Sequence, residues 1–188
     1  ALARKAEDIS FAEIIRIKDF RESSMPDYPG STLAEWPAIF QRFGVHRLGV
    51  AGWHMLPHTL FKNIAAALGE AHITDADELV RKVTLKKSQA EQACLREAAR
   101  ISELGFKAVL EHIKPRMTET QLVGIATGAM LANGAEATGY PVWCCSGPNS
   151  TQAISRPTHR RVQEGEIINF SIGAKVAGYS ASLGRPVV

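Results

Sequence analysis

Two helix-start signals of the same kind, in the second half of the sequence, constrain the fold of this chain most strongly. Ser88-Gln-Ala-Glu91 and Thr118-Glu-Thr-Gln121 each place a hydroxyl three residues before a Glu or Gln side chain. In such a capping box the hydroxyl accepts a hydrogen bond from an early helical N–H group, and the Glu or Gln accepts one from the N–H of the capping residue. We therefore predict two closely spaced helices, over 88–113 and 118–132.

The sequence after these helices changes from a helical to a strand-like period. Apolar and polar residues alternate in Val142–Ser146, Glu166–Ile172 and Lys175–Ser182, whereas the stretch from Gly147 to about Pro157 is rich in Gly, Pro, Asn and Ser. A period of two is typical of strands, and the Gly- and Pro-rich stretch is typical of a loop. We predict three strands, the last two joined around Gly173-Ala174 as a hairpin or as a bent ribbon, so that 85–188 is an α+β region.

The first part of the chain alternates between strand-like and helix-like segments. Strand character is found within Phe11–Phe20 and near 47–51 and 72–74, and helical spacing is found over about 32–43, 56–68 and 75–81. This alternation favours an α/β layer over 1–84. The sequence starts without Met and stops just after a strand-like stretch, so we expect a fragment or a processed piece.

Composition and charge exclude several classes of protein. With 45% hydrophobic and 22% charged residues, the chain is ordinary for a globular protein and unlike a disordered or collagen-like one. The sequence has neither a membrane-spanning stretch of about 18 apolar residues nor the apolar segment of a signal peptide. The net charge of +3 comes without a run of like charges, so we expect no nucleic-acid partner. Three cysteines without a Cys-x-x-Cys pair favour a reduced, cytoplasmic protein.

Short motifs in the second half of the chain form a recognisable set. They are Lys87–Glu91 followed by the two helices, Ser146-Gly147-Pro148-Asn149, Gly165-Glu166, and Gly178-Tyr179 with Arg185. This set resembles the creatinase/prolidase/aminopeptidase P family. The resemblance implies the pita-bread fold preceded by a creatinase-type α/β domain. It implies that 1–84 is the C-terminal part of that N-terminal domain and that 85–188 is the first half of the catalytic domain.

The resemblance implies two metal-binding aspartates, and this sequence has serine at both positions. Metallopeptidases of the family carry Asp-x-Gly on one strand and Gly-Tyr-x-x-Asp-x-x-Arg on the next. The matching stretches here are Ser171-Ile-Gly173 and Gly178-Tyr-Ser-Ala-Ser182-Leu-Gly-Arg185, and no Asp occurs from Glu78 to Val188. Because a pair of divalent ions needs bridging carboxylates and a serine hydroxyl carries no charge, we expect the dinuclear Mn, Co or Zn site to be lost and predict no cofactor.

The proton-transfer residue of the non-metal branch is also replaced. The resemblance to creatinase, which hydrolyses a C–N bond without these metal ligands, implies a His five residues after the Asn of Ser-Gly-x-Asn, and that position is Ile154 here. An aliphatic side chain cannot transfer protons. His159, in the same loop, is the catalytic candidate that remains. A thiol nucleophile at Cys144 or Cys145 is an alternative, although a buried inert thiol is the more common situation.

The residues left at the family's site predict a pocket without negative charge. We assign to it, as substrate-binding candidates beside Trp143, the residues Arg185, Tyr179, Ser171, Ser182, Asn149 and Ile154. The guanidinium of Arg185 presents a fork of donors that suits a carboxylate. We therefore expect a small carboxylate-bearing or peptide-like ligand.

Three interpretations of the function remain open. The first is a C–N hydrolase of the creatinase type, peptidase- or amidinohydrolase-like and metal-independent. The second is a catalytically silent homologue that binds a small molecule, a peptide or a protein. The third is an Xaa-Pro peptidase with a rebuilt metal site. The resemblance also implies a homodimer, to which His54 and His58 of the first domain could contribute.

Overall fold

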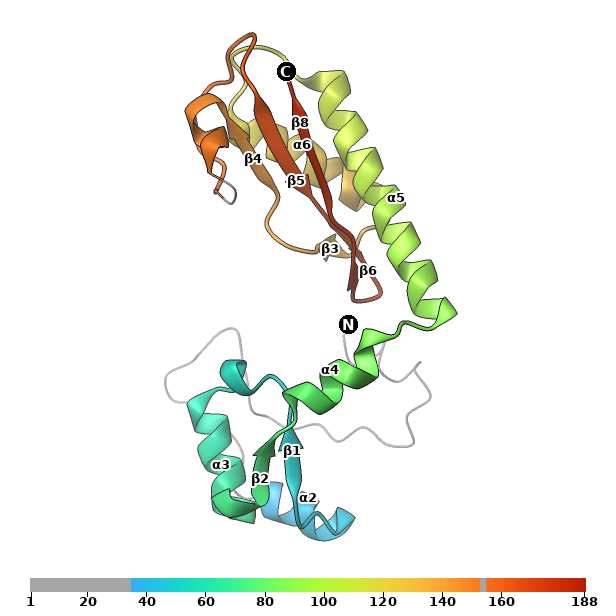
Figure 1. Cartoon of the computed structure of the whole chain (residues 1–188), viewed down its shortest axis with the longest axis vertical. Helices are drawn as coiled ribbons and strands as arrows, with labels where there is room; N and C mark the ends of the chain where they lie inside the picture. The colour runs from blue at the N-terminus through green and yellow to red at the C-terminus, as the bar shows by residue number, and fades with distance from the viewer. Residues whose placement is uncertain (1–34, 153–154) are drawn as a thin grey trace. The chain divides into compact units, whose positions relative to one another are not determined.

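The computed structural model describes residues 35–152 and 155–188. Contacts within the chain divide it into two compact units, Ala1–Lys86 and Lys87–Val188, and each is described by itself (Figure 1). The strand predicted within Phe11–Phe20 and the start of the helix predicted over 32–43 lie outside the described residues. Within the described ranges, no helix is long and apolar enough to cross a membrane.

The first unit holds two parallel strands joined by a helix. Strand β1 (Leu48–Val50) pairs with β2 (Ile73–Asp75), and helix α3 (His58–Leu68) lies between them in the chain. Parallel neighbours require such a crossover connection. Its small core is built on Phe40, Ile64 and Ile73. The other elements are helix α2 (Glu35–Phe43), helix α4 (Asp77–Leu85) and two short 3-10 turns, η1 (Trp53–Met55) and η2 (Glu70–His72).

Both helices predicted from the capping boxes are confirmed in the second unit. Helix α5 spans Gln89–His112 and helix α6 spans Glu119–Ala132. The Ser88 hydroxyl accepts from the Glu91 N–H at 3.3 Å, and the Ser88 N–H donates to the Glu91 carboxylate at 2.7 Å. Thr118 and Gln121 exchange the same two hydrogen bonds at 3.1 and 2.8 Å. These bonds satisfy groups that have no partner within a helix start.

The two helices approach each other at a glycine. A Cβ atom on Gly105 of α5 would lie 2.7 Å from Cγ of Met130 and 3.2 Å from the carbonyl oxygen of Ala126, both on α6. Met130 and Ala126 are fully buried, as are Ile101 and Leu122. Because protein interiors are close-packed, the contact between α5 and α6 depends on the missing side chain at position 105.

Two antiparallel three-stranded sheets complete the second unit. The larger has the order β4-β5-β8, with β4 at Trp143–Ser146, β5 at Ile168–Ile172 and β8 at Leu183–Val187. The smaller has the order β3-β6-β7, with β3 at Ala137–Thr138, β6 at Ala174–Val176 and β7 at Tyr179–Ser180. A 3-10 turn, η3 (Gly147–Thr151), follows β4.

Of the hairpin and the bent ribbon predicted around Gly173-Ala174, the hairpin is wrong, and the structure has the continuous path of a ribbon there. The chain passes through Gly173 directly from β5 into β6, and it reverses at Ala177 and Gly178, where φ is 48° and 84°. Positive φ at both central residues belongs to the two-residue hairpin turn whose twist matches that of the strands. The stretch predicted as one strand, Lys175–Ser182, is therefore divided between β6, the turn and β7.

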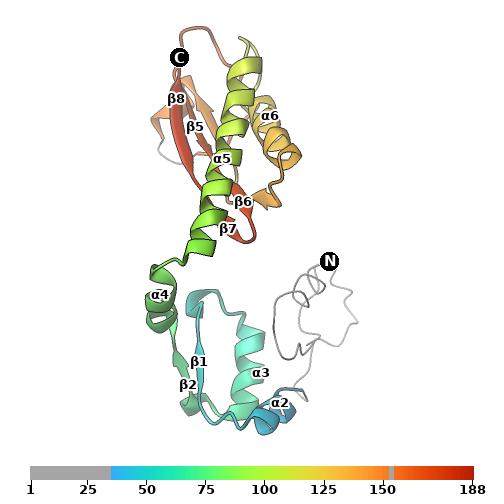
Figure 2. The ribbon, with the colours of Figure 1, turned by 90° about the vertical axis from the view of Figure 1, so that its right-hand side faces the viewer.

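The larger sheet packs one face against the helices. Ile168, Phe170 and Ile172 of β5 are buried, and the ring of Phe170 lies edge-on to that of Phe106 on α5, with centroids 6.0 Å apart. Figure 2 shows α5 and α6 on the same side of the sheet. Alternate residues of β5 therefore belong to the opposite face.

That opposite face carries polar and aromatic residues. Asn169 and Ser171 of β5 pair across the strands with Cys145 and Trp143 of β4. Directly paired residues project from the same face of an antiparallel sheet. We call the face defined by Trp143, Cys145, Asn169 and Ser171 the polar face.

We predict opposite effects of alanine at two glycines of the helix pair. Gly105→Ala introduces a methyl group into the filled space around Met130, so it should lower the free energy of unfolding by about 1–3 kcal/mol. Gly128→Ala on α6 meets no atom within 4 Å and should raise it by up to about 1 kcal/mol, because alanine loses less backbone entropy. Urea denaturation of both variants measures the two changes. Equal stability of the two would contradict the close approach at Gly105.

Candidate functional site

A cavity of about 290 Å³ lies on the polar face. Its lining combines two aromatic residues, a cysteine, two residues with side-chain amides, two serines and an arginine. The residues that line it are Trp143, Cys145, Gln152, Ser155, Asn169, Phe170, Ser171, Gly184, Arg185 and Pro186. The lining contains no Asp, Glu or His, so the cavity carries no carboxylate of its own.

The two serines at the positions of the family's metal ligands meet at a tyrosine. The Tyr140 hydroxyl lies 3.0 Å from Oγ of Ser171 and 2.9 Å from Oγ of Ser182. The Tyr140 ring packs against the ring of Trp143, with centroids 5.3 Å apart. Three hydroxyls from three separate segments therefore form one neutral cluster beside the cavity.

This cluster does not fit a pair of divalent ions. Hard cations require anionic oxygens, and the three groups here are alcohols or phenols that bond to one another. Among the residues that the structure describes, no group of three or more His, Cys, Asp and Glu side chains could hold a metal ion. The chemistry of the donor set thus disagrees with the dinuclear site that the resemblance implies.

Two of the predicted binding residues, Arg185 and Tyr179, lie apart from this cluster. Arg185 pairs with Phe170 across β5 and β8, one position from the Ser171–Gly184 pair, and its guanidinium donates to the Gly184 carbonyl at 2.8 Å. The Tyr179 hydroxyl donates to the Glu91 carboxylate at 2.9 Å, and this bond raises the pKa of Tyr179. The structure therefore brings Ser171 and Ser182 together and ties Tyr179 to the start of α5.

Asn149 belongs to a second polar cluster, built on a residue that the sequence reasoning missed. Glu119, the first residue of α6, is fully buried, and its two oxygens accept hydrogen bonds from Ser146, Asn149 and Thr158. Sequence reasoning assigns a Glu in the first turn of a helix to solvent and to the helix dipole. Its donors lie 27 to 39 residues away, and no local pattern points to them.

The pKa of the Glu119 carboxyl is lowered. Burial alone would raise it, but the N–H groups of Ser146 and Thr158, together with the two hydroxyls of the same residues, favour the charged form. Glu119 is therefore a buried carboxylate that stays ionised at neutral pH.

Neither cysteine of the strand β4 has an activated thiol. Cys144 is fully buried, and burial raises the pKa of its thiol far above the ordinary value. The pKa of Cys145 is also raised, again mainly by burial, and its thiol donates to the Ser155 carbonyl at 3.3 Å. Since the thiolate is the nucleophile, both groups are poorly suited to nucleophilic attack at neutral pH.

No histidine is among the residues that line the cavity. His159 is exposed, and its Nδ1 atom is 3.5 Å from the Thr120 hydroxyl at the start of α6. His54 and His58 are exposed in the first unit, and Ile154 lies outside the described residues. His159 is therefore placed beside α6 rather than beside Ser171.

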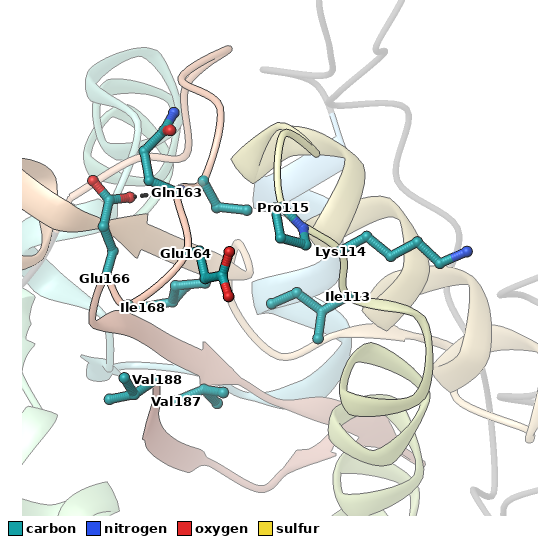
Figure 3. Close-up of a pocket in the computed structure, with 11 residues that line it drawn as sticks. Ile113, Lys114, Pro115, Gln163, Glu164, Glu166, Ile168, Val187 and Val188 are labelled. Carbon is teal, nitrogen blue, oxygen red and sulfur yellow. Dashed lines mark hydrogen bonds between the residues drawn. The ribbon is translucent and has the colours of Figure 1, made fainter.

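A second cavity, of about 180 Å³, lies at the end of α5 (Figure 3). Aliphatic side chains from three elements surround it, among them Ile113, Ile168 and Val187. Glu166 at its edge already accepts from the Gln163 N–H at 2.9 Å and from the Arg160 guanidinium. The lining is mainly aliphatic, but it also includes Lys114 and the carboxylate of Glu164.

The fold is that of a pita-bread protein with a neutral hydroxyl cluster beside a polar cavity, and comparisons with known proteins agree on the class. The X-Pro aminopeptidase from Thermotoga maritima superposes with a TM-score of 0.75 at 22% identity, covering 82% of this chain and 43% of that one. The Xaa-Pro dipeptidase from Bacillus anthracis gives a TM-score of 0.76 at 22% identity, covering 86% of this chain and 45% of the dipeptidase chain. The expected pita-bread fold is confirmed by these likenesses.

Sequence comparison identifies the family. The model of metallopeptidase family M24 matches residues 93–188, and this chain belongs to that family. It is 30% identical over 151 residues to a creatinase from Bacillus sp., covering 76% of this chain and 36% of the relative. It is 24% identical over 173 residues to the uncharacterized peptidase YqhT from Bacillus subtilis, covering 92% of this chain and 48% of that relative. The chain thus spans about half or less of the length of these relatives.

We predict that Glu119 makes the stability of the second unit depend on pH. Because its pKa is lower in the folded than in the unfolded chain, its contribution is complete well above the ordinary pKa of 4.5 and is lost as the pH falls through the folded-state value. Urea denaturation between pH 7 and pH 3 should show this loss below about pH 5. In Glu119→Gln the acid-dependent loss should be smaller. An identical pH profile in the variant and the unmodified chain would contradict the assignment.

We predict a measurable coupling within the hydroxyl cluster. Tyr140→Phe removes both hydrogen bonds and should lower the free energy of unfolding by about 1 kcal/mol. In a double-mutant cycle, Tyr140→Phe and Ser171→Ala should couple by roughly 0.5–1 kcal/mol, because they remove the same bond. The matched control pairs Tyr140→Phe with Thr84→Ala in the first unit, where the effects should add. Additive effects at Ser171 as well would argue against the cluster.

Proposed function

We propose that this chain forms part of a metal-independent hydrolase that cleaves a C–N bond in a small carboxylate-bearing or peptide-like molecule. The observation that carries the proposal is the contact of the Tyr140 hydroxyl with Ser171 and Ser182. A neutral hydroxyl cluster stands where the family's peptidases would need two carboxylates. The 30% identity to a creatinase, over three quarters of the chain, supports the same branch.

The cluster suits an oxygen acceptor on the ligand. The three hydroxyls carry three protons, and the two hydrogen bonds among them use two. One proton remains for a further acceptor, such as a carboxylate or an amide carbonyl. Ser171 lines the cavity, and the ring of Trp143 offers a flat apolar wall to the rest of the molecule. A free cation would find no counter-charge there.

The chain's own residues bind and orient in this proposal. Hydroxyl and amide groups of the cavity hold the ligand, and the Trp143 ring covers it from water. Proton transfer needs a group whose pKa lies near neutrality, and no residue of the cavity lining supplies one. We assign that role to a group beyond the described residues. A homodimer and a cytoplasmic location remain parts of the proposal.

A catalytically silent binding protein is the second candidate. The observation that favours it is the placement of His159, which is exposed and contacts Thr120 on α6. In that case the same cavity would bind its ligand without turnover. An Xaa-Pro peptidase with a rebuilt metal site is the third, and the donor set at Ser171 and Ser182 argues against it.

The assay that separates these candidates uses the full-length protein with X-Pro dipeptides, creatine and related amidino acids, with and without EDTA. We expect hydrolysis that EDTA does not change, because among the described residues no group of three or more His, Cys, Asp and Glu side chains could hold a metal ion. Hydrolysis abolished by EDTA and restored by Mn²⁺ would overturn the proposal in favour of the peptidase. Binding without hydrolysis, measured by calorimetry on the same compounds, would favour the silent homologue.

A direct measurement of metal affinity complements this assay. Titration of the full-length protein with Mn²⁺, Co²⁺ or Zn²⁺ in a calorimeter should show no stoichiometric tight binding, because neutral hydroxyls bind hard cations weakly. His54 and His58 are exposed histidines of the first unit and do not belong to the cavity lining. Replacing both by Ala is a control for weak metal binding at the surface. Tight binding that persists in this control would contradict a metal-independent site.

A further inference from the structure

Glu119 is a fully buried carboxylate in the second unit, and it lies at the point where two loop segments meet α6. Its Oε1 atom accepts from the Ser146 N–H at 2.7 Å, from the Ser146 hydroxyl at 2.8 Å and from the Asn149 amide at 3.2 Å. Its Oε2 atom accepts from the Thr158 N–H and from the Thr158 hydroxyl, both at 2.8 Å. The Asn149 amide also lies 3.4 Å from Oε2, so the carboxylate joins the two segments.

The same two segments form one side of the cavity. Segment 146–152 ends in Gln152, and segment 155–160 begins with Ser155, and both of these residues line the cavity. Each segment is also bound to the sheet. Asn169 donates to the Ser150 carbonyl at 2.9 Å, and Cys145 donates to the Ser155 carbonyl at 3.3 Å.

A guanidinium is linked to the buried carboxylate through the Ser146 hydroxyl. The Arg160 side chain donates to the Ser146 hydroxyl at 2.8 Å and forms an ion pair with Glu166. The Ser146 hydroxyl therefore accepts from Arg160 and donates to Glu119. This chain of bonds leaves no room for a side chain at Gly147, where a Cβ atom would lie within 2.8 Å of the Arg160 guanidinium. Burying the Glu119 carboxylate is tolerated because hydrogen bonds from these neutral groups replace its hydration.

We propose that Glu119 is a positioning residue for ligand recognition: its carboxylate fixes segments 146–152 and 155–160, and thereby places Gln152 and Ser155 against the polar face. This proposal rests on the function proposed above in one respect: it takes the same cavity as the ligand site. A role limited to the helix dipole needs one or two donors of α6 itself. Here the carboxylate instead accepts from residues of two other segments.

The test compares four variants by amide hydrogen exchange. Glu119→Gln keeps the shape but presents an NH₂ group to donors, and Thr158→Val keeps the N–H but loses the hydroxyl. Thr158→Ser retains both the N–H and the hydroxyl donor, so its exchange rates should match those of the unmodified chain. Glu103→Gln, at an exposed position of α5, is the control. In Glu119→Gln we expect exchange at the Ser146 and Thr158 amides to speed up roughly tenfold to a hundredfold, because each loses a charge-assisted bond.

Three results decide the proposal. It stands if exchange rises at Ser146 and Thr158 while the amides of Phe170 and Ile172 in β5 keep their rates, and if Thr158→Ser behaves like the unmodified chain. It falls if the Thr158 amide exchanges at the same rate in Glu119→Gln. It also falls if all amides of the second unit speed up equally, because Glu119 would then contribute to stability alone.

A ligand readout separates this proposal from the proposed function. Creatine and Gly-Pro are titrated into the full-length protein and its Glu119→Gln variant. If either is hydrolysed, we expect KM to rise about tenfold with kcat changed less than about threefold, since a displaced wall weakens binding. A kcat loss with KM unchanged would overturn the positioning role. If neither compound binds the unmodified protein, the proposed function fails, and the exchange rates still decide whether Glu119 fixes the two segments.

Discussion

The buried carboxylate of Glu119 is the interaction on which the geometry of the site depends. A charge removed from water is costly unless donors replace its hydration, and Glu119 has five such donors from three residues. None of these donors could move alone without leaving part of the carboxylate unpaired. The end of β4, the turn after it and the segment near Thr158 are therefore fixed as a group, and the cavity takes its shape from them.

At Ser171, which also lines the cavity, the polar groups are joined by hydrogen bonds between neutral side chains. A metal pair would cross-link its strands through charged oxygens, whereas the Tyr140 hydroxyl links Ser171 to Ser182 with two ordinary bonds. Such bonds contribute about 1 kcal/mol each, so packing must hold most of this region together. Ile172 and Phe170, buried on the helix side of β5, provide that packing.

The helices could be predicted from the sequence because capping boxes are local: Ser88 and Glu91 carry the whole signal within one turn. The position of the hairpin turn at Ala177-Gly178 could not be predicted from the sequence, because an alanine does not indicate a positive φ. The cluster of Tyr140 with the two serines and the bonds of Glu119 join residues that are 27 to 42 positions apart. Residue types predicted that the metal ligands were replaced, but only the fold determines which hydroxyl takes their place.

The two clusters differ in a way that bears on how a fold changes its chemistry. The Glu119 cluster carries a buried charge and many bonds, so replacing one member leaves the others unpaired. The Tyr140 cluster is neutral and made of side chains alone, so each member can change at a small cost in stability. A family that keeps one fold for different reactions can therefore keep the first cluster as a framework and vary the second. On this reasoning the proposed ligand contacts depend on the hydroxyl cluster of Ser171 and Ser182, and the shape of the cavity depends on Glu119.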